Sequence, residues 1–255
     1  MRLQSVWLAM LMVSAASLPS HADSITVTYG APGMQTPSAA VSRYATTIGT
    51  ETFDNRTSGS FITSFGTGGA ITGTYSGGSI ASANLYGGAG GSGSYIQALA
   101  NTVGYTITLA TPGVPGVNYF GYWLSALDAG NQLTFKRDGA VVGSYSSADL
   151  VRALGGCSAS NPFCGNPTTR SKSQDSGEAF AFVNFVDLNG FFDEIDVYEK
   201  PATGNYESDN HTVAYCPTPS ACVNGTAIPE PTPILVIAAA TIGLALFRLR
   251  HRLRG

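Results

Sequence analysis

Short stretches in which apolar and polar residues alternate run through the middle of the chain. The alternation is strict in residues 105–109, Tyr-Thr-Ile-Thr-Leu, and it returns later, where Ile195 and Val197 fall on the opposite face from Asp196. Successive side chains of a β-strand point to opposite faces of its sheet, so each stretch predicts a strand with one face toward a core. Glycine and serine recur between the stretches, which favours tight turns over long helices.

The clearest series of strands is predicted for residues 117–145. An aromatic run at residues 119–124 comes first, and Asp138-Gly139 later joins two alternating stretches, as is typical of a hairpin. Residues 147–154 are the one helical segment, with Ser146 or Ser147 as its N-cap. About ten short strands and one short helix predict an all-β fold, an antiparallel β-sandwich of jelly-roll-like form.

The first 22 residues have the parts of a secretory signal peptide. Arg2 provides a positive start, residues 6–18 are mostly apolar, and small residues surround the expected cleavage after Ala22. We therefore assign residues 1–22 to a signal peptide and residues 23–215 to a β-sandwich ectodomain that is exported.

The C-terminal part of the chain predicts a single transmembrane helix. Residues 234–247 are uncharged and mostly apolar, although this run is shorter than the roughly 20 residues of a comfortable helical span. Positive residues stay on the cytoplasmic face of a membrane, so the ectodomain is expected outside. A buried C-terminal helix is the disfavoured alternative, because the run is followed by four arginines, Arg248, Arg250, Arg252 and Arg254.

Residues 229–255, which begin with Pro229, Glu230 and Pro231, resemble the PEP-CTERM sorting signal in the order of motif, apolar helix and basic tail. The resemblance implies a Gram-negative bacterium, usually one that makes exopolysaccharide, with signal peptidase and an exosortase as processing partners. It implies a precursor anchored in the inner membrane, then processed at the motif and located at the outer cell surface or in the extracellular matrix. It implies nothing about the activity of the ectodomain.

The predicted ectodomain is acidic. Residues 23–247 contain sixteen acidic and eight basic residues, a net charge of −8, whereas the whole chain has a net charge of −3. Proteins that bind nucleic acids present clustered positive charge to the phosphate backbone. The composition therefore excludes a nucleic-acid partner.

Four cysteines form two close pairs along the chain. An exported chain is expected to oxidise them, and we favour the local pairings Cys157 with Cys164 and Cys216 with Cys222, because short loops close at low entropic cost. A four-cysteine zinc site is disfavoured, since its ligand pairs are usually about two to four residues apart. Residues 216–228 are expected to form a spacer that contains a disulfide and prolines.

Candidate catalytic residues are scarce. His211 is the one histidine of the predicted ectodomain, and no serine lies in a Gly-x-Ser-x-Gly motif, so we assign no catalytic residue and expect a protein that is not an enzyme. Paired carboxylates support glycoside hydrolysis in other proteins. They leave a secreted polysaccharide-active glycosidase or lyase as an alternative, with seven candidates: Asp187, Asp193, Glu194, Asp196, Glu199, Glu207 and Asp209.

Two further groups of residues suggest ligand binding. Asp54, Asp209 and Asn210 resemble the positions at which carbohydrate-binding jelly rolls hold structural calcium, with plain surface polarity as the alternative. Trp123, Tyr122 and Tyr119 could stack on sugar rings, although alternation favours the core for at least half of this aromatic run. The leading expectation is a non-enzymatic surface or matrix protein, and the first alternative is a carbohydrate-binding module for the producer's exopolysaccharide, stabilised by calcium.

Overall fold

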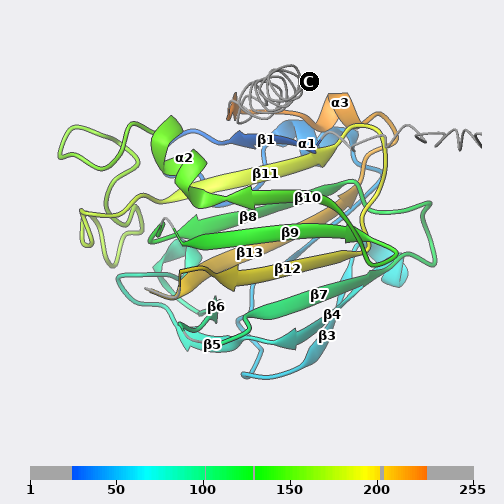
Figure 1. Ribbon diagram of the computed structural model, residues 1–255, viewed down its shortest axis with the longest axis horizontal. Coiled ribbons are helices and arrows are strands. Elements are labelled where there is room, and N and C mark those ends of the chain that lie inside the picture. The colour runs from blue at the N-terminus through cyan, green and yellow to red at the C-terminus, as the bar shows by residue number, and fades with distance from the viewer. Residues whose placement is uncertain (1–24, 101, 129, 202–203, 229–255) are drawn as a thin grey trace, which may run out of the picture.

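The computed structural model describes residues 25–100, 102–128, 130–201 and 204–228. In these residues the chain folds into two antiparallel β-sheets that pack face to face (Figure 1). The larger sheet has eight strands, which are, in spatial order, β14 (Thr226–Ala227), β1 (Ile25–Tyr29), β11 (Ala181–Asp187), β8 (Tyr119–Ser125), β13 (Tyr206–Tyr215), β6 (Ser94–Ala98) and β5 (Ser79–Ser82), with β2 (Thr47–Glu51) also paired to β13.

The smaller sheet faces the viewer in Figure 1. Its six strands are, in spatial order, β10 (Ala140–Ser146), β9 (Asn131–Arg137), β12 (Glu194–Glu199), β7 (Tyr105–Ala110), β4 (Ile71–Gly77) and β3 (Phe61–Phe65). Short helices connect the strands of the described chain, namely α1 (Ala39–Tyr44), α2 (Ser147–Ala153), α3 (Pro219–Cys222) and two 3-10 turns, Thr67–Gly69 and Ala89–Gly91.

The antiparallel β-sandwich predicted from the sequence is confirmed. In β12, Ile195 and Val197 are buried and Asp196 is half-buried on the other face, as the alternation requires. Asp138 and Gly139 both have positive φ, 49° and 76°, which is the backbone of the type I′ turn that suits a two-residue hairpin. Each local pattern therefore formed the element that it favours.

Helix α2 is also confirmed, and its first turn explains where it begins. The Ser146 side chain accepts a hydrogen bond from the Ala148 N–H and so satisfies one of the amides that a helix start leaves unpaired. The expectation of a single helix is wrong, because the described residues add α1 and α3. Both are one turn or little more, and both pack on the outer face of the larger sheet through Val41 and Cys222.

Residues 216–228 were expected to form a spacer, but they are part of the folded body. Helix α3 and strand β14 lie within them, and Cys216, Cys222 and Ile228 are buried. The second disulfide and the pairing of β14 with β1 hold this segment against the larger sheet. A proline-rich composition therefore concealed an ordered segment.

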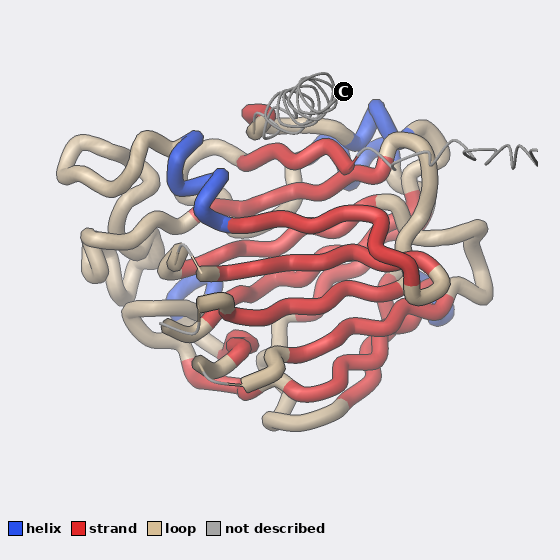
Figure 2. Tube along the Cα trace, viewed as in Figure 1, coloured by secondary structure: helices blue, strands red, loops and turns tan. Residues whose placement is uncertain are grey.

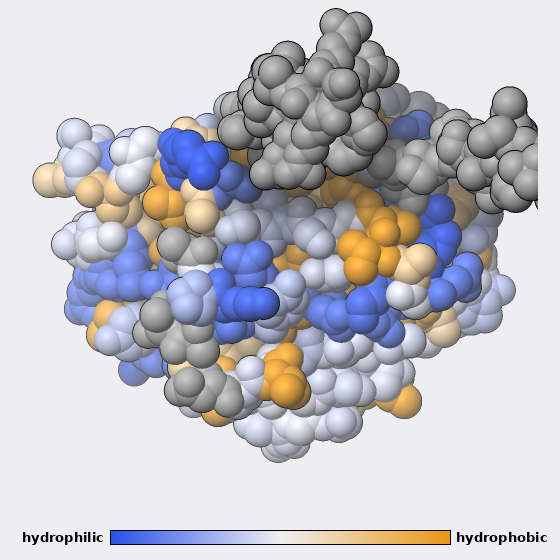
Figure 3. All heavy atoms as spheres, in the orientation of Figure 1, coloured by the Kyte–Doolittle hydropathy of each residue, from blue (hydrophilic) through white to orange (hydrophobic). Residues whose placement is uncertain are grey.

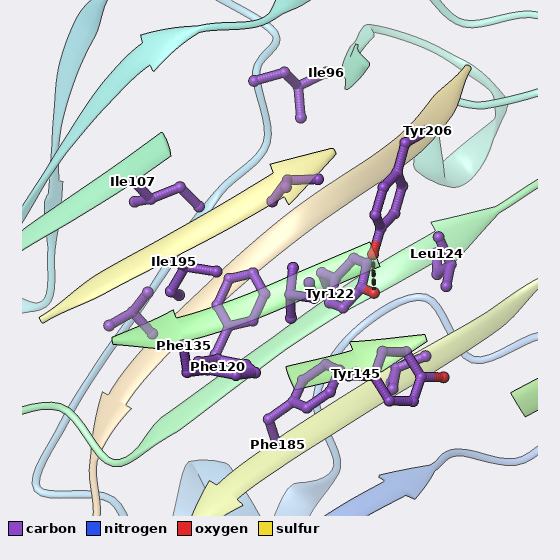
Figure 4. Close-up of a cluster of buried hydrophobic side chains, with 14 of the residues drawn as sticks. Ile96, Ile107, Phe120, Tyr122, Leu124, Phe135, Tyr145, Phe185, Ile195 and Tyr206 are labelled. Carbon is purple, nitrogen blue, oxygen red and sulfur yellow. Dashed lines mark hydrogen bonds between the residues drawn. The ribbon is translucent and has the colours of Figure 1, made fainter. Parts of the chain in front are cut away.

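The main core lies between the two sheets (Figure 4). Phe120 and Phe185 of the larger sheet meet Phe135 of the smaller sheet, with ring centroids 5.0–6.2 Å apart. The hydroxyl groups of Tyr122 and Tyr206 share a hydrogen bond of 2.5 Å inside this core. These two hydroxyl groups thus satisfy each other inside the core.

A second layer covers the outer face of the larger sheet. Trp123 and Phe182 pack there against Met34 and Ala89, which belong to loops, and Tyr119 packs near α1 and α3. Figure 2 shows how much of the chain at the left end of the sheets is loop. Strand β8 is consequently buried on both faces, at all seven positions.

The predicted signal peptide, the sorting motif, the transmembrane helix over residues 234–247 and the basic tail lie outside the described residues. In the ranges that the structure does describe, no helix combines the length and the apolar character that crossing a bilayer requires.

Candidate functional site

Four strand ends meet at the left of the sandwich in Figure 1. Strands β8 and β12 end there, and β9 and β13 begin there. Five carboxyl groups gather at this end, and each acts electrostatically on at least one of the others. We call them the acidic end: Asp128, Asp175, Glu178, Glu199 and Glu207. None of the described lysines, arginines or histidines forms an ion pair with any of the five.

Glu199 points between the two sheets. It is the last residue of β12, in step with the buried Ile195 and Val197, and it is 7% exposed. Neither of its carboxylate oxygens has a hydrogen-bond partner in the described chain. Burial disfavours the charged form and raises the pKa of Glu199 to about 7, and the negative charge of Asp128 adds to this shift.

Asn131 lies directly opposite Glu199, at the start of β9. Its side chain is fully buried, and both its Oδ1 and its Nδ2 lack a partner among the described residues. Directly opposed residues of antiparallel strands have Cβ atoms about 4.5–5.5 Å apart. An unpaired carboxylate and an unpaired amide therefore lie side by side, an arrangement that native proteins rarely leave without a bound water or ion.

Glu207 belongs to the other face of the larger sheet, the one that loops cover. It is 6% exposed and lies beside Ser125, whose Oγ is buried without a partner in the described chain. Burial raises the pKa of Glu207 to about 8, with further contributions from the charges of Asp128, Glu178 and Glu199. The acidic end thus includes one carboxyl group between the two sheets, that of Glu199, and one on the outer face of the larger sheet, that of Glu207.

The remaining carboxyl groups are in two loops, Asp128 between β8 and β9, and Asp175 and Glu178 between α2 and β11. Burial raises the pKa of Glu178 to about 7, helped by the neighbouring Asp175, with which its carboxyl group shares a hydrogen bond. Burial and the charge of Asp175 also raise the pKa of Asp128, which is in the loop between β8 and β9. All of these pKa shifts have the same sign, because burial, and after it the neighbouring negative charges, disfavour the charged form of each carboxyl group.

Two glycines allow the backbone to approach these groups. A Cβ atom on Gly130 would collide with Glu199 Oε1 and with the Pro201 carbonyl oxygen, and a Cβ atom on Gly204 would collide with Asp128 Oδ2. Glycine is therefore required at both positions for the carboxyl groups to remain where they are. The Glu199 carboxylate, the Asn131 amide and the Pro201 carbonyl are all at the same end of β9 and β12.

The side-chain atoms that the acidic end offers to a ligand are oxygens. Hard cations such as calcium take carboxylate, amide and backbone carbonyl oxygens together. No three Asp, Glu, His or Cys side chains of the described residues converge closely enough to hold a metal by themselves, so a cation here would depend on amide and carbonyl oxygens as well. Glycoside hydrolysis fits less well, because Glu199 and Glu207 are too deeply buried to flank a sugar ring.

The residues predicted as calcium ligands lie against the glycine-rich segment of residues 87–93. Asp209 Oδ2 accepts a hydrogen bond of 2.7 Å from the Ala89 N–H, and Asp54 Oδ1 accepts one of 3.0 Å from the Ser94 N–H. These contacts give both carboxylates a structural role in holding that loop.

Asn210 is brought to the same place by an irregularity in β13. The pairing of β13 with β8 shifts register between Asp209 and Thr212, and Asn210 has a positive φ of 51°. Its Nδ2 donates to the Gln35 carbonyl oxygen at 2.7 Å. Burial and the charge of Asp54 raise the pKa of Asp209 to about 7. The three residues are neighbours, and calcium bound to them stays a prediction.

The aromatic residues considered as sugar-binding platforms are buried. Trp123 and Tyr119 are 0% exposed and Tyr122 is 1% exposed, so none of them offers a ring face to a ligand in this structure. Tyr122 points into the core, while Tyr119 lies near α1 and α3 and Trp123 lies under loop residues. The core interpretation therefore describes all three, including the two that alternation would have placed outside.

His211 is in the core. Its Nε2 lies 2.9 Å from Ser208 Oγ and its Nδ1 lies 3.1 Å from the Tyr75 hydroxyl group, and the residue is 0% exposed. Burial lowers the pKa of His211 to about 3, so the ring is neutral. The serine and histidine are adjacent but closed off from solvent, which makes this a packing arrangement.

Both predicted disulfides are present, Cys157 with Cys164 and Cys216 with Cys222. Pro229, Glu230 and Pro231 lie outside the described residues, as do Arg248, Arg250, Arg252 and Arg254.

The acidic end was not recognised from the sequence. Asp128 and Asn131 have the composition of a turn, and Glu199 looks like the polar end of a strand. One usable sequence pattern existed, because Glu199 is in step with Ile195 and Val197 and so belongs to the inner face. The closeness of Asp128, Glu178 and Glu207 depends on the fold and has no local pattern.

Comparison of the chain with protein-family models, with curated proteins and with solved structures finds no match in any of the three.

Proposed function

We propose that this chain is a non-enzymatic protein of the cell surface or extracellular matrix, exported through its signal peptide and processed by an exosortase at Pro229-Glu230-Pro231. The observation that carries the proposal is the order of features in residues 229–255, where the Pro-Glu-Pro motif is followed by an uncharged apolar run and then by four arginines.

The residues directly before the motif pair with the edge of the larger sheet. Strand β14 pairs with β1, and the Ile228 N–H donates to the Val27 carbonyl oxygen at 3.0 Å. Ile228 is 8% exposed, and the Thr28 hydroxyl group donates to the Asn224 carbonyl oxygen. These contacts attach the residues directly before the motif to the larger sheet.

The disulfides support the same proposal. All four cysteines of the chain are paired, and such bonds form and persist outside the reducing cytosol. An acidic surface with few lysines and arginines also suits a protein among extracellular polymers. We further propose that the sandwich is of the jelly-roll kind, because strands from distant parts of the chain, such as β1 with β11 and β8 with β13, are neighbours in the larger sheet.

Expression in a host with an exosortase tests this function. The chain should reach the outer surface without its C-terminal segment, whereas a variant with Pro229→Ala, Glu230→Ala and Pro231→Ala should stay in the inner membrane with that segment attached. A matched control replaces Pro217 and Pro219 of the folded body and should be sorted normally. Equal surface delivery of the motif variant, with the segment still attached, would refute the proposal.

Carbohydrate binding is the second candidate, and the outer face of the smaller sheet favours it. Rows of hydroxyl groups cross β4 and β7, where Thr74 is paired with Thr108 and Ser76 with Thr106. In Figure 3 this face has blue charged residues across its middle and mostly pale residues below them. No helix of the described chain covers this face in Figure 1, so the hydroxyl groups of Thr74 and Thr108 are exposed to solvent.

Polysaccharide pull-down assays test this candidate. Replacing Thr74 and Thr108 with lysine should abolish retention on the producer's exopolysaccharide, because the long side chains would block the flat face. Thr102→Lys, at an exposed loop position, is the matched control. Equal retention of the unchanged chain, the variant with lysine at residues 74 and 108, and the Thr102→Lys control would exclude this face as the binding surface.

A further inference from the structure

We infer that the acidic end binds a calcium ion, with the Glu199 carboxylate and the Asn131 amide oxygen as ligands and Asp128 as the second carboxylate. This site differs from the one predicted at Asp54, Asp209 and Asn210, and it does not depend on the proposed function. The inference rests on unpaired buried oxygens, on charge and on the backbone around them.

The unpaired atoms are the first argument. Glu199 is more than nine-tenths buried and Asn131 is fully buried, yet none of their side-chain polar atoms has a hydrogen-bond partner among the described residues. Leaving a buried carboxylate unpaired costs a large desolvation free energy, which proteins avoid by pairing the group or by coordinating a metal. The two side chains face each other across β12 and β9, so one ion can satisfy both.

Charge is the second argument. Asp128, Glu178 and Glu207 all act on Glu199 or on one another, and no described basic side chain forms an ion pair with them. The carboxylates of Asp54 and Asp209, by contrast, each accept a hydrogen bond from a backbone N–H group. Glu199 accepts no hydrogen bond from the described residues, and a divalent cation would compensate its charge.

The kind of ligand selects the cation. Neither a histidine nor a cysteine belongs to the acidic end, which disfavours zinc and other transition metals. Calcium accepts six to eight oxygens in irregular geometry, including amide and backbone carbonyl oxygens, whereas magnesium demands near-octahedral sites and keeps several waters. Two carboxylates and one amide oxygen are ligands of the kind that calcium accepts.

The site would also have a mechanical consequence. Asn131 begins β9, Glu199 ends β12, and Asp128 is in the loop that enters β9. An ion bound to all three would fasten the loop to the ends of two strands of the smaller sheet. Calcium should therefore stabilise the folded state as well as bind to it.

The test uses the full chain with its disulfides oxidised and its metals removed by chelation. Calcium chloride is titrated calorimetrically at slightly alkaline pH, and thermal unfolding is compared in calcium, in magnesium and in chelator. We expect saturable calcium binding, a higher unfolding temperature in calcium and a smaller effect of magnesium. Glu199→Gln and Asn131→Ala should each weaken calcium binding by about tenfold or more.

Two variants separate this site from other acidic groups. Glu194→Gln lies on the same strand as Glu199 but on the solvent face, and Asp209→Asn lies in the other carboxylate set. Both should bind calcium as the unchanged chain does. The inference is overturned if calcium neither binds nor raises the unfolding temperature of the unchanged chain, or if Asp209→Asn abolishes binding while Glu199→Gln and Asn131→Ala leave it intact.

Discussion

Glu199 and Asn131 are register partners at the end of β12 and β9, and all four of their side-chain polar atoms are buried without a hydrogen-bond partner in the described chain. A buried polar group without a partner lowers the stability of the folded state, because it loses its hydration and gains no hydrogen bond in return. Their presence makes the end of the sandwich the most informative place for mutation.

In calcium-free buffer Glu199→Gln should stabilise the protein at about pH 8 by about 1–2 kcal/mol, because it removes an unpaired buried charge and adds a donor for Asn131 Oδ1. The pKa of Glu199 is raised to about 7, so the carboxyl group is charged at the higher pH and neutral well below it. The gain in the free energy of unfolding from Glu199→Gln should therefore be smaller at about pH 5. Denaturant unfolding at both pH values measures the stability difference between Glu199→Gln and the unchanged chain. An equal difference at the two pH values would show that the charge of Glu199 is not the cause.

His211 should make the protein less stable in mild acid. Its pKa is lowered from 6.5 to about 3 in the folded state. Between these two pH values the histidine is protonated in the unfolded chain and neutral in the folded chain. The stabilising contribution is complete above about pH 6.5 and is lost as the pH falls toward 3, amounting to about 2 kcal/mol between pH 7 and pH 5. In His211→Gln this part of the pH dependence should disappear from urea unfolding curves, and an unchanged slope would contradict the assignment.

Asp209→Ala should loosen the glycine-rich segment of residues 87–93. The change removes the acceptor of the Ala89 N–H and the acceptor of the Asn210 N–H, at a cost of about 1–3 kcal/mol. Hydrogen exchange at Ala89 should accelerate, while exchange at Ser94, which is bonded to Asp54, changes less. Uniform acceleration at both amides would point to general destabilisation. Asp209→Asn, which keeps one oxygen acceptor, is the milder control.

The two disulfides should differ in their contribution to stability. Each closes a short loop, so the entropic contribution is about 2–3 kcal/mol for either. Cys216 and Cys222 are also buried against Tyr119, whereas Cys157 and Cys164 are half-buried in a loop. Double replacement with alanine should therefore lower the thermal midpoint more for the Cys216 pair, and equal losses would show that the packing around it contributes little.

Much of the fold could be predicted because local patterns and the fold agree in the smaller sheet. Its strands have one face on the core and one toward solvent, so β7 and β12 alternate as the sequence does. The larger sheet has both faces covered, and β8 is buried throughout. Alternation therefore could not show that loops cover Trp123 and that short helices cover Tyr119.

The acidic end could not be predicted for a related reason. Its carboxyl groups come from separate strands and loops, and their closeness depends on register, as when Glu199 falls opposite Asn131. The disulfides were predictable because each closes within a few residues. Residues 216–228 show the opposite case, since prolines suggested a spacer while Ile228 and β14 attach to β1 through long-range contacts.

Intact mass measurement of the native protein tests the central claim most directly. Material recovered from the cell surface should begin near Asp23, should end at or beside Pro229-Glu230-Pro231, and should contain no free thiol. Recovery of the unprocessed chain of 255 residues from the cytosol, with its cysteines reduced, would contradict export, processing and the proposed function together.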